Sequence, residues 1–435
     1  ADVAIEKNKP TPVAAYLDGA AIIAAAKSVG AGAIHPGYGF LSGNAGFARQ
    51  VQKAGLTFIG PSPEAIELMG DKVRARAFVA ERGFPVAPSA IEDDEPMTFA
   101  ARAAKVGFPL LIKPAAGGGG KGMRIVRERG ALGAEIERAR SEGLRYFGDG
   151  RLYVERYVER PRHIEVQVFG DSHGNLVHFW ERECSVQRRF QKVLEEAPSP
   201  ALDETKRLAI CEAAVGVARA AGYSSAGTVE FIYGQDGIFY FLEMNTRLQV
   251  EHPVTEMITG VDLVQEQLRI AAGEPLGYDQ SAIGRQGHAI ELRLYAEDAA
   301  RDFAPTTGPI LLWHQPHGGG IRVDAGFAAG QTVTPAFDPL LAKLVVHGET
   351  RAAAIAKAGQ ALKDFAVLGL TTNSGFLGRL LAHPGFAAGE FHTGFIAEHP
   401  ELTQAPTLSP ERLNLLLGAA ALSTRSVRDA ADAVP

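Results

Sequence analysis

Polar side chains recur at every second position along one stretch of the chain, directly after an apolar run at 238–242 that is typical of a buried strand. They are Glu243, Asn245, Arg247, Gln249 and Glu251. If the strand stays extended, these side chains share one face. Two carboxylates, two amides and a guanidinium are costly to bury together unless a metal ion or an anion joins them. The oxygens suit a hard cation such as Mg²⁺, and the arginine suits bicarbonate, a carboxylate or a phosphate. A solvent-facing ladder of salt bridges would give the same pattern.

Another carboxylate lies on the strand that precedes this stretch. Glu230 stands in the middle of Gly-Thr-Val-Glu-Phe-Ile, and Gly-Gln-Asp-Gly forms the turn between the two strands. If the strands pair as a hairpin, Glu243 and Asn245 come within reach of Glu230. Two adjacent carboxylates repel each other unless a proton or a divalent cation lies between them. We therefore expect a site for a divalent ion, with a shared proton or a displaced strand register as the alternatives.

A glycine-rich loop indicates phosphate chemistry. Four glycines and the pair Lys-Gly occupy 117–122, between predicted strands at 109–114 and 123–126. Glycines let backbone N–H groups approach phosphate oxygens because no Cβ blocks the way. The spacing fits neither a Rossmann fingerprint nor a P-loop, and the loop alone could be a hairpin tip. Lys113 on the preceding strand favours a bound anion, because a buried lysine needs a partner, and Lys72 is a second candidate.

The composition is that of an ordinary globular protein of two to three domains. The chain has 435 residues, of which 46% are hydrophobic and 22% charged. A net charge of -6 gives no electrostatic footprint for nucleic acid or for an anionic membrane. No apolar stretch approaches the ~20 residues of a membrane span. With only Cys184 and Cys211 present, we expect a reducing cytoplasmic compartment and two buried thiols that are not nucleophiles.

Alternating strand and helix patterns predict an α/β fold with α+β character. Residues 1–72 are predicted to be a truncated doubly wound domain, because the chain reaches a helix before any complete strand–helix unit. Residues 73–272 carry the glycine loop and end in one long helix predicted at 255–271. Residues 287–398 are rich in strands, and 399–435 are predicted to be a linker or docking segment. Strands are predicted at 152–157, 163–169, 176–183, 227–233, 237–244, 288–295, 309–313, 320–324 and 340–347.

Six sequence motifs occur together along the chain. They are His-Pro-Gly-Tyr-Gly-Phe-Leu-Ser (35–42), Met-Gly-Asp-Lys (69–72), Lys113 with the glycine loop, Glu-Cys-Ser-Val-Gln-Arg-Arg (183–189), Gln-Lys-Val-Leu-Glu-Glu-Ala-Pro (191–198) and the run from Glu243 to Glu256. Together they resemble the biotin carboxylase component of biotin-dependent carboxylases, in the ATP-grasp superfamily. The resemblance covers roughly residues 1–396, and the last run is highly specific. It implies the alpha subunit of an acyl-CoA carboxylase, truncated at its N-terminus, with an ATP-grasp domain and a strand-rich C-terminal domain.

The resemblance also implies roles for individual residues. The expected nucleotide contacts are Lys72, Lys113, Gly119, Gly120, Glu155, Arg156, Val158, His163 and Gln187. The expected ligands of Mg²⁺ or Mn²⁺ are Glu230, Glu243 and Asn245. The expected bicarbonate pocket consists of Lys192, Arg247 and the Val250 backbone. Glu251 is expected to be the general base, and Arg322 is expected to steady the ureido oxygen of biotin.

The implied reaction is ATP-dependent carboxylation of biotin by bicarbonate through carboxyphosphate. Glu251 would take the proton of bicarbonate, while Arg247 and Lys192 hold the dianion in line with the γ-phosphate. The implied cofactors are ATP, Mg²⁺ or Mn²⁺, and biotin carried by another domain or chain, because no Ala-Met-Lys-Met site occurs here. The implied partners are a biotin carboxyl carrier domain, a carboxyltransferase subunit and a second copy of this chain. The acyl acceptor is chosen by the other active site.

Two other hypotheses remain open at this point. Another ATP-grasp ligase, forming an amide bond, would keep the glycine loop and the glutamate pair but would not need the polar run 247–251 or Arg322. A catalytically inactive dimerisation module is disfavoured, because Lys113 and the paired glutamates are present. Three sites depart from the family pattern, and one of them is Ala336-Phe337, where a pair of tyrosines is frequent. Gly43 stands where glutamate is usual, and Phe190 stands where histidine is common, so a carboxylate and one nucleotide contact are expected to be missing.

Overall fold

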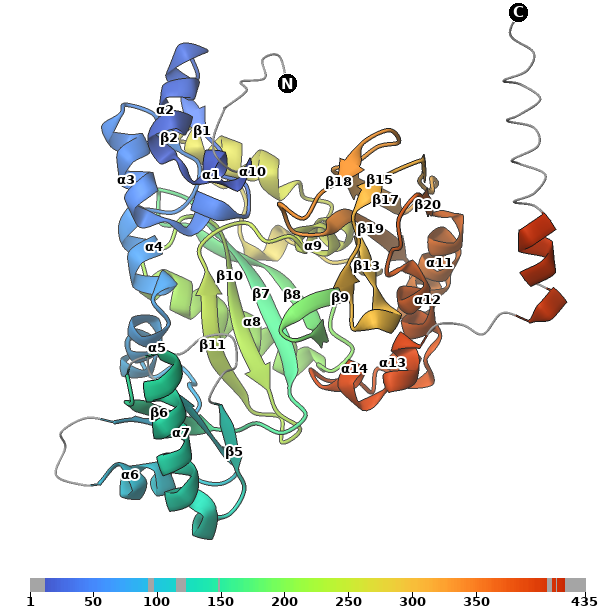
Figure 1. The fold of residues 1–435 in the computed structure, drawn as a ribbon. Helices are drawn as coiled ribbons and strands as arrows, with labels where there is room; N and C mark the ends of the chain where they lie inside the picture. Colours follow the sequence, from blue (N-terminus) through green and yellow to red (C-terminus); the bar gives the residue numbers. More distant parts are fainter. Residues whose placement is uncertain are drawn as a thin grey trace, which may run out of the picture.

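A large antiparallel sheet lies at the centre of the molecule, with helices on both faces, as the predicted mixed α/β class requires (Figure 1). The computed structural model describes residues 12–92, 98–114, 123–147, 149–404, 409–411 and 413–418. The predicted phosphate loop, with Gly119 and Gly120, lies outside the described residues.

The N-terminal part pairs two short parallel strands with helices. The strands are β1 (Ala33–Ile34) and β2 (Thr57–Phe58), and the helices are α1 (Pro12–Leu17), α2 (Gly19–Ser28), α3 (Ala45–Lys53), α4 (Pro63–Gly70) and α5 (Lys72–Glu81). Helix α5 begins at Lys72 because the Asp71 carboxylate accepts hydrogen bonds from the next backbone N–H groups. Helix α5 also packs against strand β11, which places Lys72 beside the polar face of the sheet.

Eight antiparallel strands form the central sheet in the order β11-β10-β7-β8-β9-β12-β19-β17. They are β7 (Arg162–Gly170), β8 (Leu176–Arg188), β9 (Gln191–Ala197), β10 (Ser225–Tyr233), β11 (Phe239–Asn245), β12 (His288–Tyr295), β17 (Ile321–Ala325) and β19 (Leu340–Gly348). Strands β9 and β12 pair through Leu194–Ala197 and Ala289–Leu292. The predicted segments 73–272 and 287–398 therefore contribute to a single sheet, and the domain limits between them stay predictions.

The two faces of this sheet differ in chemistry. One face is mainly apolar and is covered by helix α8 (Glu204–Ala220) and helix α11 (Arg351–Asp364), whose alanines pack on residues such as Val166 and Leu292. The other face carries charged side chains and packs against helix α9 (His252–Thr259) through small apolar contacts. Helix α10 (Leu263–Ala271) follows α9. Side chains alternate along each strand, so the charged groups gather on the face that α9 covers.

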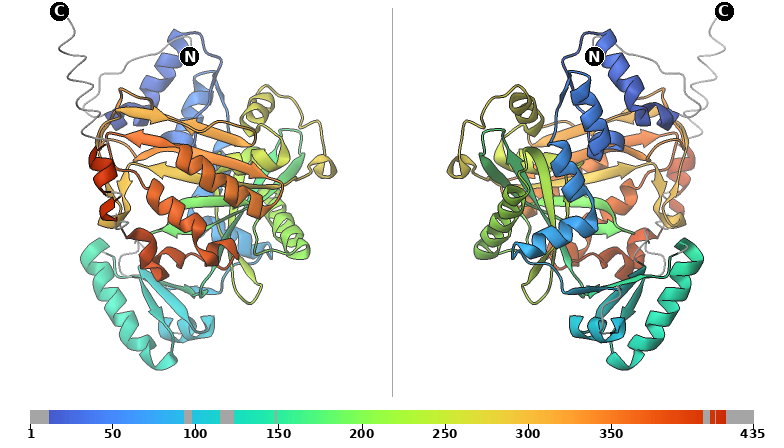
Figure 2. Two further views of the ribbon diagram at one scale, coloured as in Figure 1. Left: turned by 90° about the vertical axis from the view of Figure 1, so that its right-hand side faces the viewer. Right: turned by 90° about the vertical axis from the view of Figure 1, so that its left-hand side faces the viewer.

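A smaller antiparallel sheet stands at one end of the molecule, opposite helices α1 to α3 (Figures 1 and 2). Its strands, in spatial order, are β3 (Ser89–Ile91), β6 (Leu152–Arg156), β4 (Leu110–Pro114) and β5 (Arg124–Val126). Helices α6 (Phe99–Val106) and α7 (Leu132–Phe147) close its core around Leu110, Ile112 and Val154.

The C-terminal part packs its helices on the apolar face of the central sheet. These are α11, α12 (Ser374–Ala382), α13 (Pro384–Ala387) and α14 (Phe395–Glu398), and Figure 2 shows α11 and α12 lying across the strands. Within the predicted docking segment 399–435, only 399–404, 409–411 and 413–418 are described. In the described part of the chain, no helix has the length and apolar character of a membrane span.

Several predicted elements differ from those observed. The helix predicted at 255–271 is two helices, because Gly260 adopts a φ of 73° that ends α9 and Asp262 caps α10. The strand predicted at 309–313 is split into β15 (Gly308–Pro309) and β16 (Leu312–His314). Strand β9 and the extension of β8 to Arg188 were not expected, because their buried polar residues interrupt the apolar alternation.

The junction between β9 and β12 should determine the stability of the whole sheet. Leu292 is 1% exposed in the core that α11 covers. We expect Leu292→Ala to lower the free energy of unfolding by roughly 2–5 kcal/mol, because it leaves a cavity there. Denaturant unfolding measures this loss. Leu311→Ala, at a leucine that is 72% exposed, should change the same quantity by less than about 0.5 kcal/mol. Equal losses in the two variants would contradict this role of the junction.

Candidate active site

The ammonium group of Lys192 lies at the centre of a buried cluster of carboxylates. Its Nζ donates to Glu165 Oε2 and to Glu251 Oε1 at 2.6 Å each, and to Glu230 Oε1 at 3.3 Å. Burial alone would lower the pKa of Lys192, but the carboxylates of Glu165, Glu230 and Glu251 raise it well above its usual value. Lys192 is therefore charged, and it holds together side chains from three elements.

The sheet register brings these groups together. Glu230 on β10 is directly opposite Glu165 on β7, and Lys192 lies near the start of β9. Glu251 occupies the N-cap position of α9, so its carboxylate also lies near the positive end of that helix. Burial raises the pKa of Glu251, but Lys192, Arg293 and Arg182 outweigh this and hold that pKa well below its usual value.

Arg182 supports the cluster from within the sheet. Its side chain is fully buried, and its Nε donates to Glu165 Oε1 at 2.5 Å. The other guanidinium nitrogens donate to Gln167, Thr228, Gln249 and Thr255 at 2.8–3.1 Å. Because all three nitrogens of its guanidinium already donate hydrogen bonds, Arg182 is not available to a ligand. Its role here is to balance the charge of Glu165 and to fix the position of that carboxylate.

The predicted metal ligands lie side by side. Glu230 and Glu243 are register partners on β10 and β11. Asn245 Nδ2 donates to Glu230 Oε1 at 2.7 Å, and Gln249 Nε2 donates to the same oxygen at 2.8 Å. Lys72 Nζ lies 2.5 Å from Glu243 Oε2. The pKa of Glu230 is lowered, because Lys192 and His163 outweigh the effect of burial. Two paired carboxylates with an amide beside them are a set of oxygen donors that fits Mg²⁺ or Mn²⁺.

The extended strand predicted through Glu251 ends at Asn245. Beyond that residue the chain turns and enters α9, so the side chains at 247, 249 and 251 do not share a strand face. They still reach the cluster, because Gln249 and Glu251 contact Glu230 and Lys192 from the turn. The alternation therefore singled out residues that do lie close together, but the backbone that carries them is not extended, and their roles stay predictions.

Arg247 offers a guanidinium with capacity left for an anion. In the described part of the chain, its donors reach only Leu248 O at 3.3 Å and Asn245 Oδ1 at 3.1 Å. The neighbouring Val250 carbonyl oxygen accepts from Lys343 Nζ at 2.9 Å. Because Arg247 is half-buried and forms no carboxylate pair among these residues, it can still form charge-assisted hydrogen bonds with a small anion.

The predicted nucleotide contacts fall into two groups. His163 Nε2 lies 2.8 Å from Glu230 Oε2, and Gln187 Nε2 lies 3.5 Å from His163 Nδ1, so both belong to the carboxylate cluster. Lys113 and Glu155 contact each other on the smaller sheet. Arg156 ends β6, and half-buried Val158 lies in the segment that leads from β6 to β7.

Two arginines are candidates for the role predicted for Arg322, which is to steady the ureido oxygen of biotin. Arg322 Nε and Nη2 donate to both carboxylate oxygens of Asp324 at 2.8 and 2.9 Å, and Nη1 donates to Glu256 Oε2 at 2.6 Å. Arg293, which the sequence did not single out, is buried, and its Nη2 donates to Glu251 Oε2 at 2.9 Å. The arginine that contacts the predicted base is therefore Arg293.

Several residues of the cluster were missed from the sequence. They are Glu165, Arg182, Glu195, Glu291, Arg293 and Lys343. A signal was present in β12, where Glu291 and Arg293 alternate with leucine and isoleucine, but such a pattern is equally typical of a half-exposed strand. A strand that is buried on both faces and a half-exposed strand can have the same alternating sequence. Only the structure shows that both faces of β12 are buried.

The departures from the family pattern lie away from the cluster. Phe190 is 79% exposed. Gly43 ends a short 3₁₀ helix, Phe40–Gly43, in the N-terminal part. Both cysteines are fully buried, and burial raises the pKa of each thiol well above its usual value, which agrees with the predicted absence of a nucleophilic role.

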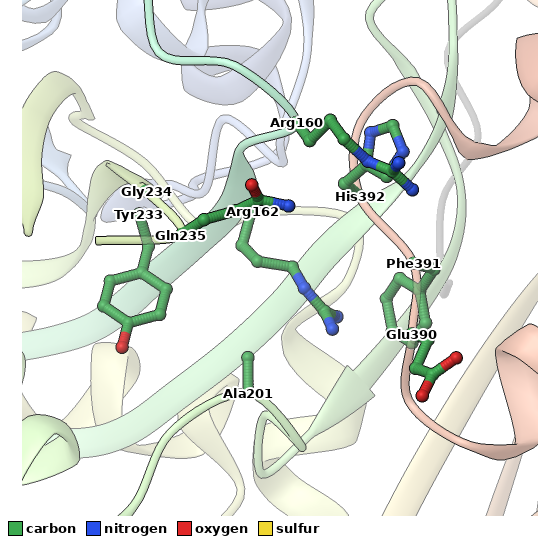
Figure 3. Close-up of a pocket in the computed structure, with 9 residues that line it drawn as sticks. All are labelled: Arg160, Arg162, Ala201, Tyr233, Gly234, Gln235, Glu390, Phe391 and His392. Atoms are coloured by element: carbon green, nitrogen blue, oxygen red, sulfur yellow. The ribbon is translucent and has the colours of Figure 1, made fainter. Parts of the chain in front are cut away.

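A cavity of about 380 Å³ lies on the other side of the sheet (Figure 3). Arg162 precedes His163 on β7 and points to the opposite face, where its guanidinium lies 4.2 Å from the centre of the Phe391 ring. The same side chain lies 3.4 Å from Glu183 Oε2. None of the predicted site residues lines this cavity, so it is separate from the carboxylate cluster.

Three family models match most of the chain. The biotin carboxylase N-terminal domain matches residues 1–66, the ATP-binding domain of the carbamoyl-phosphate synthase L chain matches 71–278, and the biotin carboxylase C-terminal domain matches 291–398.

Related proteins and solved structures agree with these matches. A biotin carboxylase of Halalkalibacterium halodurans is 50% identical over 406 residues, which cover 92% of this chain and 88% of the relative. The methylcrotonoyl-CoA carboxylase subunit alpha of Oryza sativa is 49% identical, but the chain spans only 54% of its length. The biotin carboxylase domain of the Hydrogenobacter thermophilus 2-oxoglutarate carboxylase, solved with MgADP, ADP and bicarbonate, is 43% identical with a TM-score of 0.84, covering 92% of this chain and 88% of that one. The chain belongs to the biotin carboxylase family of ATP-grasp ligases.

Proposed function

We propose that this chain carboxylates biotin with bicarbonate at the expense of ATP, and that bicarbonate is activated beside Lys192. The observation that carries the proposal is the contact of Lys192 with Glu251, with Arg247 still able to bind an anion nearby. An ammonium group and a guanidinium can hold a small planar anion while a carboxylate takes its proton. The relatives named as biotin carboxylases, and the structure solved with bicarbonate, support this choice of substrate.

The low pKa of Glu251 makes its basicity dependent on the substrate. Before bicarbonate binds, Lys192 and Arg293 stabilise the ionised carboxylate, which is then a weak base. An incoming anion shares the charge of Lys192 and adds a negative charge beside Glu251. Both effects raise the pKa of Glu251. The carboxylate therefore becomes a stronger base when there is a proton to remove.

The nucleotide is proposed to bind between the two sheets. Lys113 and Lys72 would hold phosphate oxygens, and Glu155, Arg156 and Val158 would line the adenine side. His163 and Gln187 would complete this site, together with Gly119 and Gly120, which lie outside the described residues. The present contacts of Lys72 with Glu243 and of Lys113 with Glu155 would be exchanged for phosphate contacts.

Glu230, Glu243 and Asn245 are proposed to hold Mg²⁺ or Mn²⁺, and such an ion supplies positive charge to the phosphates when it is bound. Lys72 now lies against Glu243, so the carboxylate pair already attracts a cation. Asn245 and Gln249 orient Glu230 by donating to its Oε1.

We assign the ureido-oxygen contact to Arg293 in place of Arg322. Arg322 has its donors occupied by Asp324 and Glu256, whereas Arg293 faces the base itself. A guanidinium next to Glu251 can stabilise negative charge on the oxygen of biotin as its N–H proton leaves.

Biotin on a carrier domain, a carboxyltransferase subunit and a second copy of this chain are the proposed partners. The relative named as a carboxylase subunit alpha is nearly twice as long as the matched region, which leaves room there for further domains. A ligase that forms an amide bond, the alternative left open by the sequence, would not need a carboxylate held between Lys192 and Arg293.

Replacing the proposed base tests the function directly. We expect Glu251→Gln to lower the kcat of ATP hydrolysis that depends on bicarbonate and free biotin by about 10²–10⁴-fold, because the amide cannot accept the proton. The KM for ATP should change little, since the adenine side is untouched. Glu266→Gln is the control, because Glu266 is equally buried on α10 and bonds only Arg269 and Tyr278 among the described residues. Similar losses in both variants, or wild-type hydrolysis without bicarbonate and biotin, would count against the proposal.

The assignment of the two arginines is tested with a pair of matched variants. Arg293→Lys and Arg322→Lys each keep a positive charge but lose the planar fork of donors. We expect kcat with free biotin to fall about 10–100-fold in Arg293→Lys, the loss of one charged hydrogen bond, and less in Arg322→Lys. Steady-state kinetics at saturating ATP gives both values. The reverse ranking would return the role to Arg322.

A further inference from the structure

Two buried glutamates next to Arg293 have no place in the reaction as proposed. Glu195 on β9 and Glu291 on β12 are direct register partners, so their side chains project from the same face of the sheet. Each is fully buried. Arg293 Nε donates to Glu195 Oε1 at 2.6 Å, and Arg293 Nη2 donates to Glu251 Oε2 at 2.9 Å. Arg293 is therefore held between one of these glutamates and the proposed base.

The two glutamates differ in how their oxygens are satisfied. Neither oxygen of Glu291 has a hydrogen-bond partner in the described part of the chain, and neither does the second oxygen of Glu195, Oε2. A buried ionised carboxylate without a partner is far costlier than a buried neutral carboxyl group. Glu195 and Glu291 are directly opposite each other, so one proton shared between them would satisfy Glu195 Oε2 and one of the two oxygens of Glu291.

The charged groups around Glu195 and Glu291 are compatible with a proton on one of the two carboxylates. Lys343 of β19 is occupied by the Val250 carbonyl oxygen and by Asp324, and it forms no ion pair with Glu291 among the described residues. Arg293 is shared by Glu195 and Glu251. His252 of α9, whose pKa burial lowers to about 3, is neutral and adds no charge. Among the described residues, no cation therefore forms an ion pair with Glu291.

We propose that Glu195 and Glu291 are positioning residues for this reaction: Glu195 is the ionised partner that fixes Arg293 beside Glu251, and Glu291 stays protonated and hydrogen-bonds Glu195. The inference rests on the function proposed above, in which Arg293 and Glu251 act on the substrates. An ionised Glu291 would compete for Arg293 and would add negative charge next to the base. The protonated form leaves the guanidinium in place while Glu251 gains and loses its proton.

The pKa shifts agree with this geometry. Burial raises the pKa of Glu291 well above its usual value, although Lys343 opposes the shift. Burial also raises the pKa of Glu195, but Arg293 opposes this and limits the rise to about 7, so Glu195 is the member of the pair that ionises first, from about pH 7 upward. A carboxyl group with a raised pKa in the folded protein is ionised only after unfolding at neutral pH. Its contribution to stability is therefore lost as pH rises from the unfolded value near 4.3 toward the folded pKa.

Stability measurements on an isosteric variant decide the protonation state. In wild type, unfolding releases the proton of Glu291 as pH rises, whereas the glutamine of Glu291→Gln has no proton to release. We therefore expect the ratio of the two unfolding equilibrium constants, wild type divided by variant, to rise between pH 5 and 8. The rise is at most about tenfold per pH unit, the limit for one proton. Glu196→Gln is the matched control, because Glu196 is the next residue of β9, equally buried, and faces His288 and Arg351 on the other side. Although burial opposes it, their hydrogen bonds lower the pKa of Glu196, and the bonds with Arg351 persist to pH 8, so that variant should still be destabilised at pH 8. A Glu291→Gln variant whose disadvantage is constant or grows with pH would overturn the proposal.

Activity measurements separate positioning from structure. With the full chain, ATP, bicarbonate and free biotin, we expect the alkaline limb of the pH profile of kcat to move to higher pH in Glu291→Gln. Glu195→Gln should lower kcat with little change in the KM for ATP. An unchanged alkaline limb in Glu291→Gln, or a wild-type kcat in Glu195→Gln, would refute the positioning role. If wild type has no activity with these substrates, the proposed function fails, but the stability comparison still decides the state of Glu291.

A second measurement covers the case in which Glu291→Gln does not fold. The infrared spectrum of the wild-type chain at pH 8 should contain the band of a protonated carboxyl group. The presence of this band supports the proposal, and its absence overturns it.

Discussion

One buried ammonium group keeps the whole charged face of the sheet together. Lys192 contacts Glu165, Glu230 and Glu251, which come from β7, β10 and the start of α9. Each of these carboxylates would be too costly to bury alone, and their mutual repulsion would separate the elements that carry them. The position of β9 between β8 and β12 follows from this need, because it brings Lys192 close to all three oxygens.

The division of the sheet into two faces makes such a cluster compatible with folding. Small and apolar residues of α8 and α11 cover one face and pack with its side chains into two clusters of buried apolar residues. The burial of apolar surface is the main favourable term in folding. The opposite face is then free to carry polar groups under α9. Strands β12 and β19 come from the segment predicted as a separate domain, but they belong to the same sheet as β7 to β11. The residues proposed to act in the reaction therefore come from both segments and gather at one continuous sheet. Glu251, the proposed base, belongs to one segment, and Arg293 belongs to the other.

The sequence predicted contacts best between segments that are close together in the chain. The pairing of Glu230 with Glu243 followed from a short hairpin with a turn of known composition, and the structure has that register. The roles inferred by resemblance for the metal, nucleotide and bicarbonate residues stay predictions. The run after Asn245 was expected to be extended, but His252-Pro253 opens a helix there. Arg293 was not singled out, because its environment depends on pairing with β9, almost a hundred residues earlier in the chain. Long-range pairing of this kind leaves no local signal.

The carboxylates of this face form two classes separated by Arg293. Glu230 and Glu251 lie on the side of Lys192, and cations lower the pKa of both. Glu195 and Glu291 lie on the other side, and burial raises the pKa of both. When the pKa values of neighbouring carboxylates are shifted in opposite directions, one carboxylate can keep a proton while another stays ionised and able to accept one. Since Arg293 touches both Glu195 and Glu251, a change of charge on either carboxylate alters how strongly the guanidinium holds the other. In the reaction as proposed, the proton of bicarbonate would therefore be accepted within a network that already contains a bound proton, and the strength of the base would depend on where that proton stays.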